Sequence, residues 1–307
     1  MSTDKIIEVR TAGLVEGIGR RPRRGAFSSP ASLRRWLLPA PAAAVFVGLF
    51  VTPVAFFFAM SFWRKKAMRL VPDFTFENYV ETWEKYAGVI AITLGIALAT
   101  AVLTTTIAFA FAYLIRFKAG RLGPPLLFIT LLTLFGGYLV KIYAWKSILG
   151  RDGILNSALL WLRIVREPLT IFIYNPGAVV VTLTYFLLPL AILPIYGSLR
   201  TIDDETIEAA RDVGARPRHA FRDIVFPLAR AGTLAAFTLS FLVAAGDYVT
   251  PRFVGGPYTA MIGDFIEQQF SLRFDWPMGS AMSFSVLAAC IPVVLLAAAC
   301  LSWSGRR

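Results

Sequence analysis

Long apolar stretches separated by short polar segments run along most of the chain. Five stretches contain no Asp, Glu, Lys or Arg and have about the 20 residues that a helix needs to cross a bilayer. They are Leu37–Phe62, Gly88–Ile115, Leu122–Val140, Gly177–Leu199 and Trp276–Trp303. A shorter sixth stretch, Ala231–Gly246, runs into Asp247. The pattern predicts an all-α polytopic membrane protein with six transmembrane helices and both termini on one side.

Composition supports this prediction and excludes several other classes. Of the 307 residues, 57% are hydrophobic and 16% are charged, whereas a soluble domain has about 25% charged residues. Disorder is excluded for most of the chain because disordered segments lack this much apolar surface. Two Cys and one His exclude a disulfide scaffold and a zinc cluster, so no metal site is expected.

The distribution of basic residues predicts the orientation of the spans. The chain carries 31 Lys and Arg against 19 Asp and Glu, a net charge of +12 that alone could suggest nucleic acid binding. With a cytoplasmic N-terminus, 19 basic residues fall in the inner segments and 10 in the outer loops. Cytoplasmic loops are enriched in Lys and Arg, so we expect both termini inside and no nucleic acid partner. Four basic residues oppose this bias because they fall in a predicted outer loop: Arg64, Lys65, Lys66 and Arg69.

Three segments make up the predicted organisation. Residues 1–36 are rich in Arg, Gly, Pro and Ser, which predicts a disordered basic cytoplasmic tail. Residues 37–303 form the six-helix domain, with a cytoplasmic loop at 200–230, and residues 304–307 form a cytoplasmic C-terminus. The first apolar stretch is too long for a signal peptide and indicates an uncleaved anchor. No G-x-x-x-x-G-K-[ST] phosphate loop occurs, so we expect no ATP hydrolysis by this chain.

The cytoplasmic loop has the pattern of two short helices joined by a turn. Asp203 or Asp204 could cap the first helix, and Gly214 suits the position after its end, where a positive φ is required. Pro217 suits the first turn of a second helix, and Pro227 stands where we expect the chain to turn back toward the membrane. An ordinary pair of amphipathic surface helices would explain this pattern equally.

The spacing within this loop resembles the EAA motif of ABC importer permeases. The matching residues are Glu208, Ala209, Ala210, Gly214, Ile224 and Pro227, with Phe226 where the usual pattern has Leu. The resemblance implies the MetI-like fold of type I ABC importer permeases in a bacterial inner membrane. It also implies that these six residues couple the chain to a separate ATPase, which would use ATP and Mg while this chain binds no cofactor.

Other segments resemble spermidine/putrescine permeases, and most closely the first permease of such a pair. They include Lys141–Trp145, Ile148–Asn156, Tyr174–Asn175, Leu188–Tyr196, Gly246–Pro251 and Trp276–Ala281. Lys141 departs from the Arg that is common in relatives. The resemblance implies a polyamine or a related small cation as solute. It also implies three kinds of partner: a second permease, an ATPase dimer and an extracytoplasmic solute-binding protein.

Asp247 is the one acid at the edge of a span. Carboxylates inside a membrane are costly and usually face a partner or an aqueous path. It could be the counter-charge of a cationic solute, helped by the aromatic faces of Tyr143, Trp145 and Tyr248. It could equally pair with Lys141 or Lys146, or end a helix that faces outer water.

Two alternatives to a polyamine importer remain open. The same machine could carry an opine, a phosphonate, an amino-acid derivative or ferric iron. A stand-alone channel or secondary transporter is the other class, but such transporters often show internal repeats, and no clear repeat is visible here. Pro189 and Pro194 could loosen the fourth span and serve gating.

Overall fold

The computed structural model describes residues 40–66 and 69–303. The predicted tail and the C-terminal residues 304–307 lie outside these ranges. The chain divides into two compact units, residues 1–54 and 55–307. Described residues of the first unit form α3 (Ala40–Phe46), the π-helical turn η1 (Val47–Val51) and the start of α4 (Thr52–Met60).

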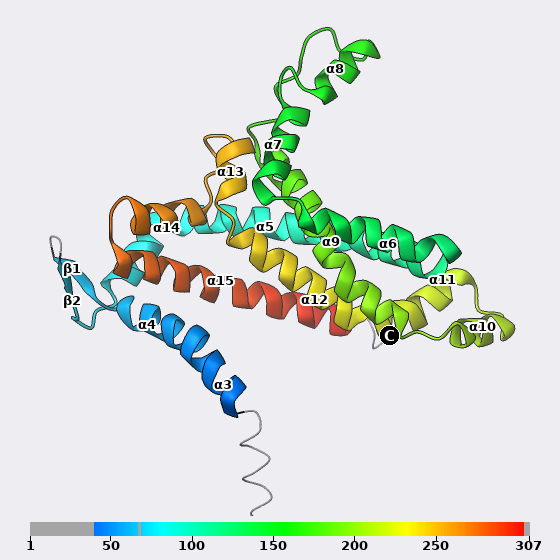
Figure 1. Ribbon diagram of the computed structural model, residues 1–307, viewed down its shortest axis with the longest axis horizontal. Coiled ribbons are helices and arrows are strands. Elements are labelled where there is room, and N and C mark those ends of the chain that lie inside the picture. Colours follow the sequence, from blue (N-terminus) through cyan, green and yellow to red (C-terminus); the bar gives the residue numbers. More distant parts are fainter. Residues whose placement is uncertain (1–39, 67–68, 304–307) are drawn as a thin grey trace, which may run out of the picture. The chain divides into compact units, whose positions relative to one another are not determined.

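The second unit is almost entirely helical (Figure 1). Its longer helices are α5 (Glu77–Phe117), α6 (Gly123–Leu132), α7 (Tyr138–Leu149), α9 (Pro176–Arg200), α12 (Phe226–Ala245), α14 (Ile262–Ser271) and α15 (Trp276–Trp303). Its shorter ones are η2 (Gly120–Leu122), η3 (Thr133–Phe135), α8 (Ile154–Trp161), α10 (Asp204–Asp212), α11 (Pro217–Ala220), η4 (Phe221–Val225) and α13 (Val249–Val254). Strands β1 (Arg64–Lys66) and β2 (Arg69–Val71) form an antiparallel hairpin in which Lys65 pairs with Leu70.

Helices α5, α9 and α12 pack together as the centre of the second unit, and α15 packs against α5 and α12. Small side chains line the buried face of α5 at helical spacing: Ala97, Ala101, Thr104, Ala108 and Ala112. Without a hydrophobic force between helices in lipid, close approach of small residues is what drives such packing. The buried face of α5 therefore lets the neighbouring helices approach closely, while larger side chains such as Phe241, Leu183 and Ile192 fill the rest of the core.

Within the described residues, five helices are long and apolar enough to cross a membrane: Ala40–Met60, Glu77–Phe117, Pro176–Arg200, Pro217–Ala245 and Trp276–Ser302. A sixth candidate is broken, because Gly120–Phe135 and Tyr138–Trp161 meet at 99°. The expectation of six spans is met if this bent pair counts as one span.

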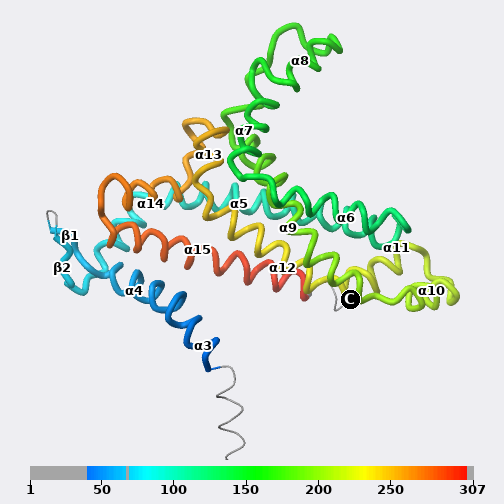
Figure 2. The backbone as a smooth tube through the Cα atoms, viewed as in Figure 1, coloured from blue at the N-terminus to red at the C-terminus, as the bar shows by residue number. Residues whose placement is uncertain are grey.

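The third predicted span, Leu122–Val140, is wrong as a straight helix. Gly136 and Gly137 have extended ψ angles of 132° and 139° and interrupt the helix. Glycine loses much conformational freedom in a helix, so two in succession favour a break. As a result, α7 leaves the direction of α6, which is visible in the tube of Figure 2.

The turn predicted at Pro227 is also wrong. Residues Pro217–Ala245 form one continuous helical segment, so the second helix of the 200–230 loop runs directly into the fifth span. The π-helical turn η4 lies just before Pro227, and the Phe226 amide bonds to the Phe221 carbonyl. A shifted hydrogen-bond frame at this point lets the helix accept a residue that has no N–H to donate.

Proline is also accommodated within α9. This helix continues through Pro189 and Pro194 without interruption. Beside it, Gly232 of α12 lies so close that an added Cβ would come within 2.2 Å of the Pro194 carbonyl oxygen. Only glycine fits this crossing of α9 and α12.

Candidate functional site

The loop at residues 200–230 forms the two-helix knob that its sequence predicts. Helix α10 ends at Asp212, and Gly214, two residues later, has φ +85°. The Gly214 amide donates to the Arg211 carbonyl at 2.8 Å, and the Ala215 amide donates to the Ala210 carbonyl at 3.0 Å. These two bonds form a Schellman motif, which requires a left-handed residue at the glycine position. Pro217 occupies the first turn of α11, as expected.

Neither predicted aspartate caps α10 through its side chain. Asp203 stands at the N-cap position without a side-chain bond. Asp204 instead pairs with Arg116 of α5 at 3.0 Å, and the same guanidinium donates to the Ile202 carbonyl at 2.8 Å. The loop is therefore tied to the C-terminal end of α5 by an ion pair that sequence reasoning did not identify.

Aromatic contacts hold the second helix of the knob against α5. The Phe221 ring lies 5.8 Å from the Phe109 ring and 5.6 Å from the Tyr113 ring. Phe226, which departs from the usual Leu, packs 6.1 Å from Phe109. Ile224 and Pro227 are half-buried beside this cluster.

The exposed side of the knob presents small and acidic residues. Glu208 and Ala209 are exposed, Ala210 is half-buried, and Val213 at the tip is 86% exposed. Glu208 also lines a hollow of about 340 Å³ between α10, α11 and the C-terminal end of α5, together with Arg116, Ile207 and Arg211. Small side chains on an exposed helix allow the backbone of another protein to approach closely.

Asp247 lies at the break between α12 and α13, and its carboxylate is fully engaged by its own chain. The residue is 8% exposed. The Tyr138 hydroxyl donates to Oδ1 at 2.7 Å, the Val249 amide donates to Oδ1 at 3.0 Å, and the Thr250 amide donates to Oδ2 at 3.2 Å. Among the described residues, neither Lys141 nor Lys146 lies within ion-pair distance of it.

The three aromatic residues proposed beside Asp247 face different neighbours. Tyr143 is exposed and packs against Phe253 at 5.1 Å. Trp145 packs against Tyr185 at 5.6 Å, and both line a hollow of about 430 Å³ beside the α6–α7 break. Tyr248 lines a different hollow of about 500 Å³ between α12, α14 and α15. In this conformation the four residues do not line one cavity.

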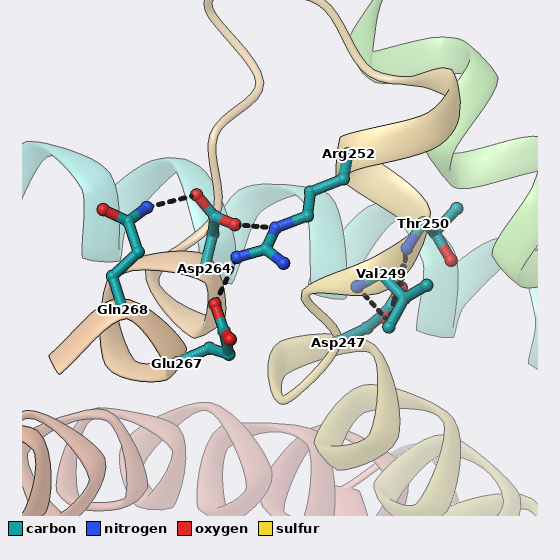
Figure 3. A network of polar contacts seen from close by, with 7 residues as sticks. All are labelled: Asp247, Val249, Thr250, Arg252, Asp264, Glu267 and Gln268. Carbon is teal, nitrogen blue, oxygen red and sulfur yellow. Dashed lines mark hydrogen bonds and ion pairs between the residues drawn. The ribbon is translucent and has the colours of Figure 1, made fainter. Parts of the chain in front are cut away.

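A charged network that sequence reasoning missed joins α13 to α14 (Figure 3). The Arg252 guanidinium bonds to the carboxylates of Asp264 and Glu267. It also lies 5.4 Å from the centre of the Tyr248 ring. Hydrogen bonding from Arg252 holds the pKa of the Glu267 carboxyl below its usual range. The spacing of Asp264 and Glu267 by one helical turn was the available sequence signal.

Two asparagines and a tyrosine in the segment between α7 and α9 have structural roles. The Asn156 side chain is buried, donates to the Gly150 and Leu169 carbonyls and accepts from the Leu169 amide. Asn175 caps α9 by accepting from the Ala178 amide at 3.0 Å. Tyr174 is exposed, and its amide donates to the Val254 carbonyl at 2.9 Å.

Known proteins share this sequence and architecture. Residues 91–307 match the family described as binding-protein-dependent transport system inner membrane component. The chain is 33% identical to the spermidine/putrescine transport system permease protein PotB of Escherichia coli (strain K12) over 214 residues, which cover 69% of this chain and 78% of PotB. It is 30% identical to the inner membrane ABC transporter permease protein YdcU of the same organism over 244 residues, 75% of each chain.

Solved structures show the fold. A bacterial ABC transporter involved in the import of the acidic polysaccharide alginate contains a chain that matches with a TM-score of 0.66 at 15% identity. The match covers 88% of the present chain and 96% of that one. The helices described above therefore adopt the fold of ABC importer permeases, as the sequence predicts.

Proposed function

Because this chain belongs to the family of binding-protein-dependent transport system inner membrane components, we propose that it forms half of a path for a polyamine or a related small cation. As a membrane component of an ABC transport system, it is a transport subunit, and ATP hydrolysis belongs to a separate partner. The observation that carries the choice of solute is the 33% identity to a spermidine/putrescine permease over most of both chains.

The partners in this proposal follow from the fact that this chain alone would form only half of a transport path. A single six-span chain builds one half, so a second, related permease supplies the other half as a heterodimer. An ATPase dimer, which uses ATP and Mg, drives the pair from the cytoplasm. A solute-binding protein delivers the solute at the outer face, and both termini of the present chain lie in the cytoplasm.

The knob of α10, α11 and η4 is the proposed contact with the ATPase. Its exposed side is formed by Glu208, Ala209, Ala210 and Gly214. Two residues of the second helix support it: Ile224 and Pro227. The Arg116–Asp204 pair and the Phe221 cluster connect it firmly to α5. Movement of the knob by a closing ATPase is thereby passed to the central helices, which is alternating access by rigid elements.

Reversing one charge on the knob tests this coupling. Glu208→Arg should abolish solute uptake while the permease stays in the membrane at its normal level, because a cation replaces the acid at the ATPase contact. Asp212→Arg is the matched control, since Asp212 is an exposed acid on the same helix but does not line the hollow beside Arg116. Normal uptake by Glu208→Arg would disprove the coupling role.

The solute path is proposed to pass Asp247, Tyr248, Tyr143 and Trp145. These residues supply a buried carboxylate and aromatic faces, which are the groups that bind amines. The solute itself is tested on the binding protein that works with this permease. Titration with putrescine and spermidine should show tight binding. If that protein ignores both and binds an anion, the choice of a polyamine is wrong.

A further inference from the structure

The ammonium group of Lys141 has no counter-charge among the described residues of its own chain. Lys141 lies on the first turn of α7, just after the Gly136–Gly137 break, and is 9% exposed. Its Nζ atom lies 5.2 Å from the centre of the Phe186 ring, and the structure shows no hydrogen bond or ion pair from it. A buried charge without a partner is strongly unfavourable, so a partner must come from elsewhere.

Three carboxylates of this chain are already engaged by other groups. Asp247 accepts from Tyr138 and two backbone amides, and Asp264 and Glu267 both bind Arg252. The Phe186 ring packs against Tyr138 at 4.6 Å and also faces Lys141. The Phe186 ring is thus the contact that the described residues provide to this ammonium.

Lys141 opens into a hollow whose walls are largely apolar. It lines this hollow of about 430 Å³ with Trp145 and Tyr185, and the other lining residues include Leu132 and Val140. Val140 is 69% exposed, and the neighbouring Phe135 is 87% exposed. A charge at the centre of an apolar patch matches the arrangement of an interface in which one ion pair is fully desolvated.

We infer that a carboxylate of the second permease subunit pairs with Lys141, and that the hollow beside it is part of the permease–permease interface. The inference rests on the proposed function, because a cationic solute would be repelled by Lys141 and cannot supply the missing charge. Lipid hydrocarbon offers no anion either. The second permease is the partner that the half-path requires, and one of its acids completes the pair.

Assembly of the two permeases tests the pair. The tagged chain is produced with its second permease, extracted in mild detergent and assayed for the amount of second permease retained. Lys141→Glu should retain at least about tenfold less, because two carboxylates would then face each other in a buried site. Lys141→Arg should retain the wild-type amount. Lys146→Glu, on the same helix but away from the hollow, should stay within about twofold of wild type.

A charge-exchange experiment identifies the acid of the second permease and distinguishes a lost ion pair from a misfolded variant. Each Asp or Glu in the membrane segments of the second permease is replaced by Lys in combination with Lys141→Glu, and one replacement should restore assembly. The neutral Lys141→Met should also reduce retention, since it leaves the partner's carboxylate unpaired. Full retention by both Lys141→Glu and Lys141→Met, or no restoring replacement, would overturn the inference.

Transport measurements separate this inference from the choice of solute. If Lys141→Met assembles normally but raises the KM for an acidic solute, Lys141 binds solute, and both proposals fail. If assembly depends on Lys141 while the binding protein carries something other than a polyamine, the interface stands and only the solute is wrong.

Discussion

At the scale of single residues, Asp247 has both a structural and a proposed transport role. Its carboxylate accepts three hydrogen bonds at the point where α12 ends and α13 begins. Irregular backbone at membrane depth is tolerated where protein groups satisfy it, and this carboxylate satisfies two amides. The same negative charge is the group proposed to attract a cation. The two roles respond differently to substitution.

Asp247→Asn and Asp247→Ala separate these roles. Asparagine keeps an acceptor oxygen for Tyr138 and Val249, so the thermal stability of the purified permease should fall by only about 1 kcal/mol. Alanine leaves up to three donors without an acceptor and should cost about 2–4 kcal/mol. Loss of the charge in Asp247→Asn should raise the KM for a dication at an unchanged level of assembled complex. An unchanged KM would show that Asp247 is structural only.

Predictability at this scale depends on how far apart the contacting residues lie. The Schellman motif at Gly214 was predictable because its bonds join residues within six positions of one another. The Tyr138–Asp247 bond joins residues 109 positions apart, and no local pattern marks Tyr138 as its donor. The pairing of Asp204 with Arg116 was missed for the same reason, since it joins α10 to α5.

At the scale of helices, the crossing of α9 and α12 is a close contact between two spans. An added Cβ at Gly232 would lie 2.2 Å from the Pro194 carbonyl oxygen and 2.4 Å from the Ser198 hydroxyl oxygen. The first of these neighbours is backbone and cannot rotate away. The two helices would therefore have to separate to accept any larger residue.

Gly232→Ala should destabilise the permease by about 1–3 kcal/mol, because overpacking at this crossing outweighs the better helix propensity of alanine. Thermal unfolding of the protein in detergent measures the effect. Gly95→Ala is the matched control, since Gly95 lies in α5 with no atom within 4 Å of an added Cβ. We expect that control to be neutral or slightly stabilising. Equal stability of the two variants would contradict the crossing described here.

Helix existence was predictable from the apolar stretches, whereas continuity was not. Each predicted span contains a helix, because about 20 apolar residues in lipid have to satisfy their own backbone. Continuity was mispredicted at two places. Two successive glycines, Gly136 and Gly137, break a predicted span, whereas Pro227, which would usually end a helix, follows a π-helical turn that absorbs it.

At the scale of the whole molecule, the orientation in the membrane is the least constrained property. It rests on the excess of basic residues in the predicted inner segments and on the position of the knob. Val213 of the knob and Tyr258 of the α13–α14 connection are 86% and 90% exposed. Figure 1 places α10 and α14 toward opposite ends of the long helices of the second unit.

Cysteine labelling in intact cells checks this orientation. With Cys290 and Cys300 replaced by Ser, a membrane-impermeant thiol reagent should label Tyr258→Cys from outside and leave Val213→Cys unlabelled. Both should react once the inner membrane is permeabilised. Labelling of Val213→Cys alone in intact cells would reverse the proposed topology.

The shape of the knob was largely predictable from the sequence, whereas the proposed solute path was not. The knob is built from one continuous segment, so spacing alone describes it. The residues proposed for the path come from α7 and from the connection between α12 and α13, and in this conformation they line separate hollows. The path as proposed also depends on a second subunit, whose side chains no single sequence contains.

In the proposed mechanism, the unbroken run from Pro217 to Ala245 acts as a lever. Its 29 residues span about 43 Å, so a tilt of about 10° around the midpoint moves each end by nearly 4 Å in opposite directions. One end carries the underside of the knob, and the other ends beside Asp247. A small push on the knob is then converted, without a hinge, into an opposite displacement next to the buried carboxylate.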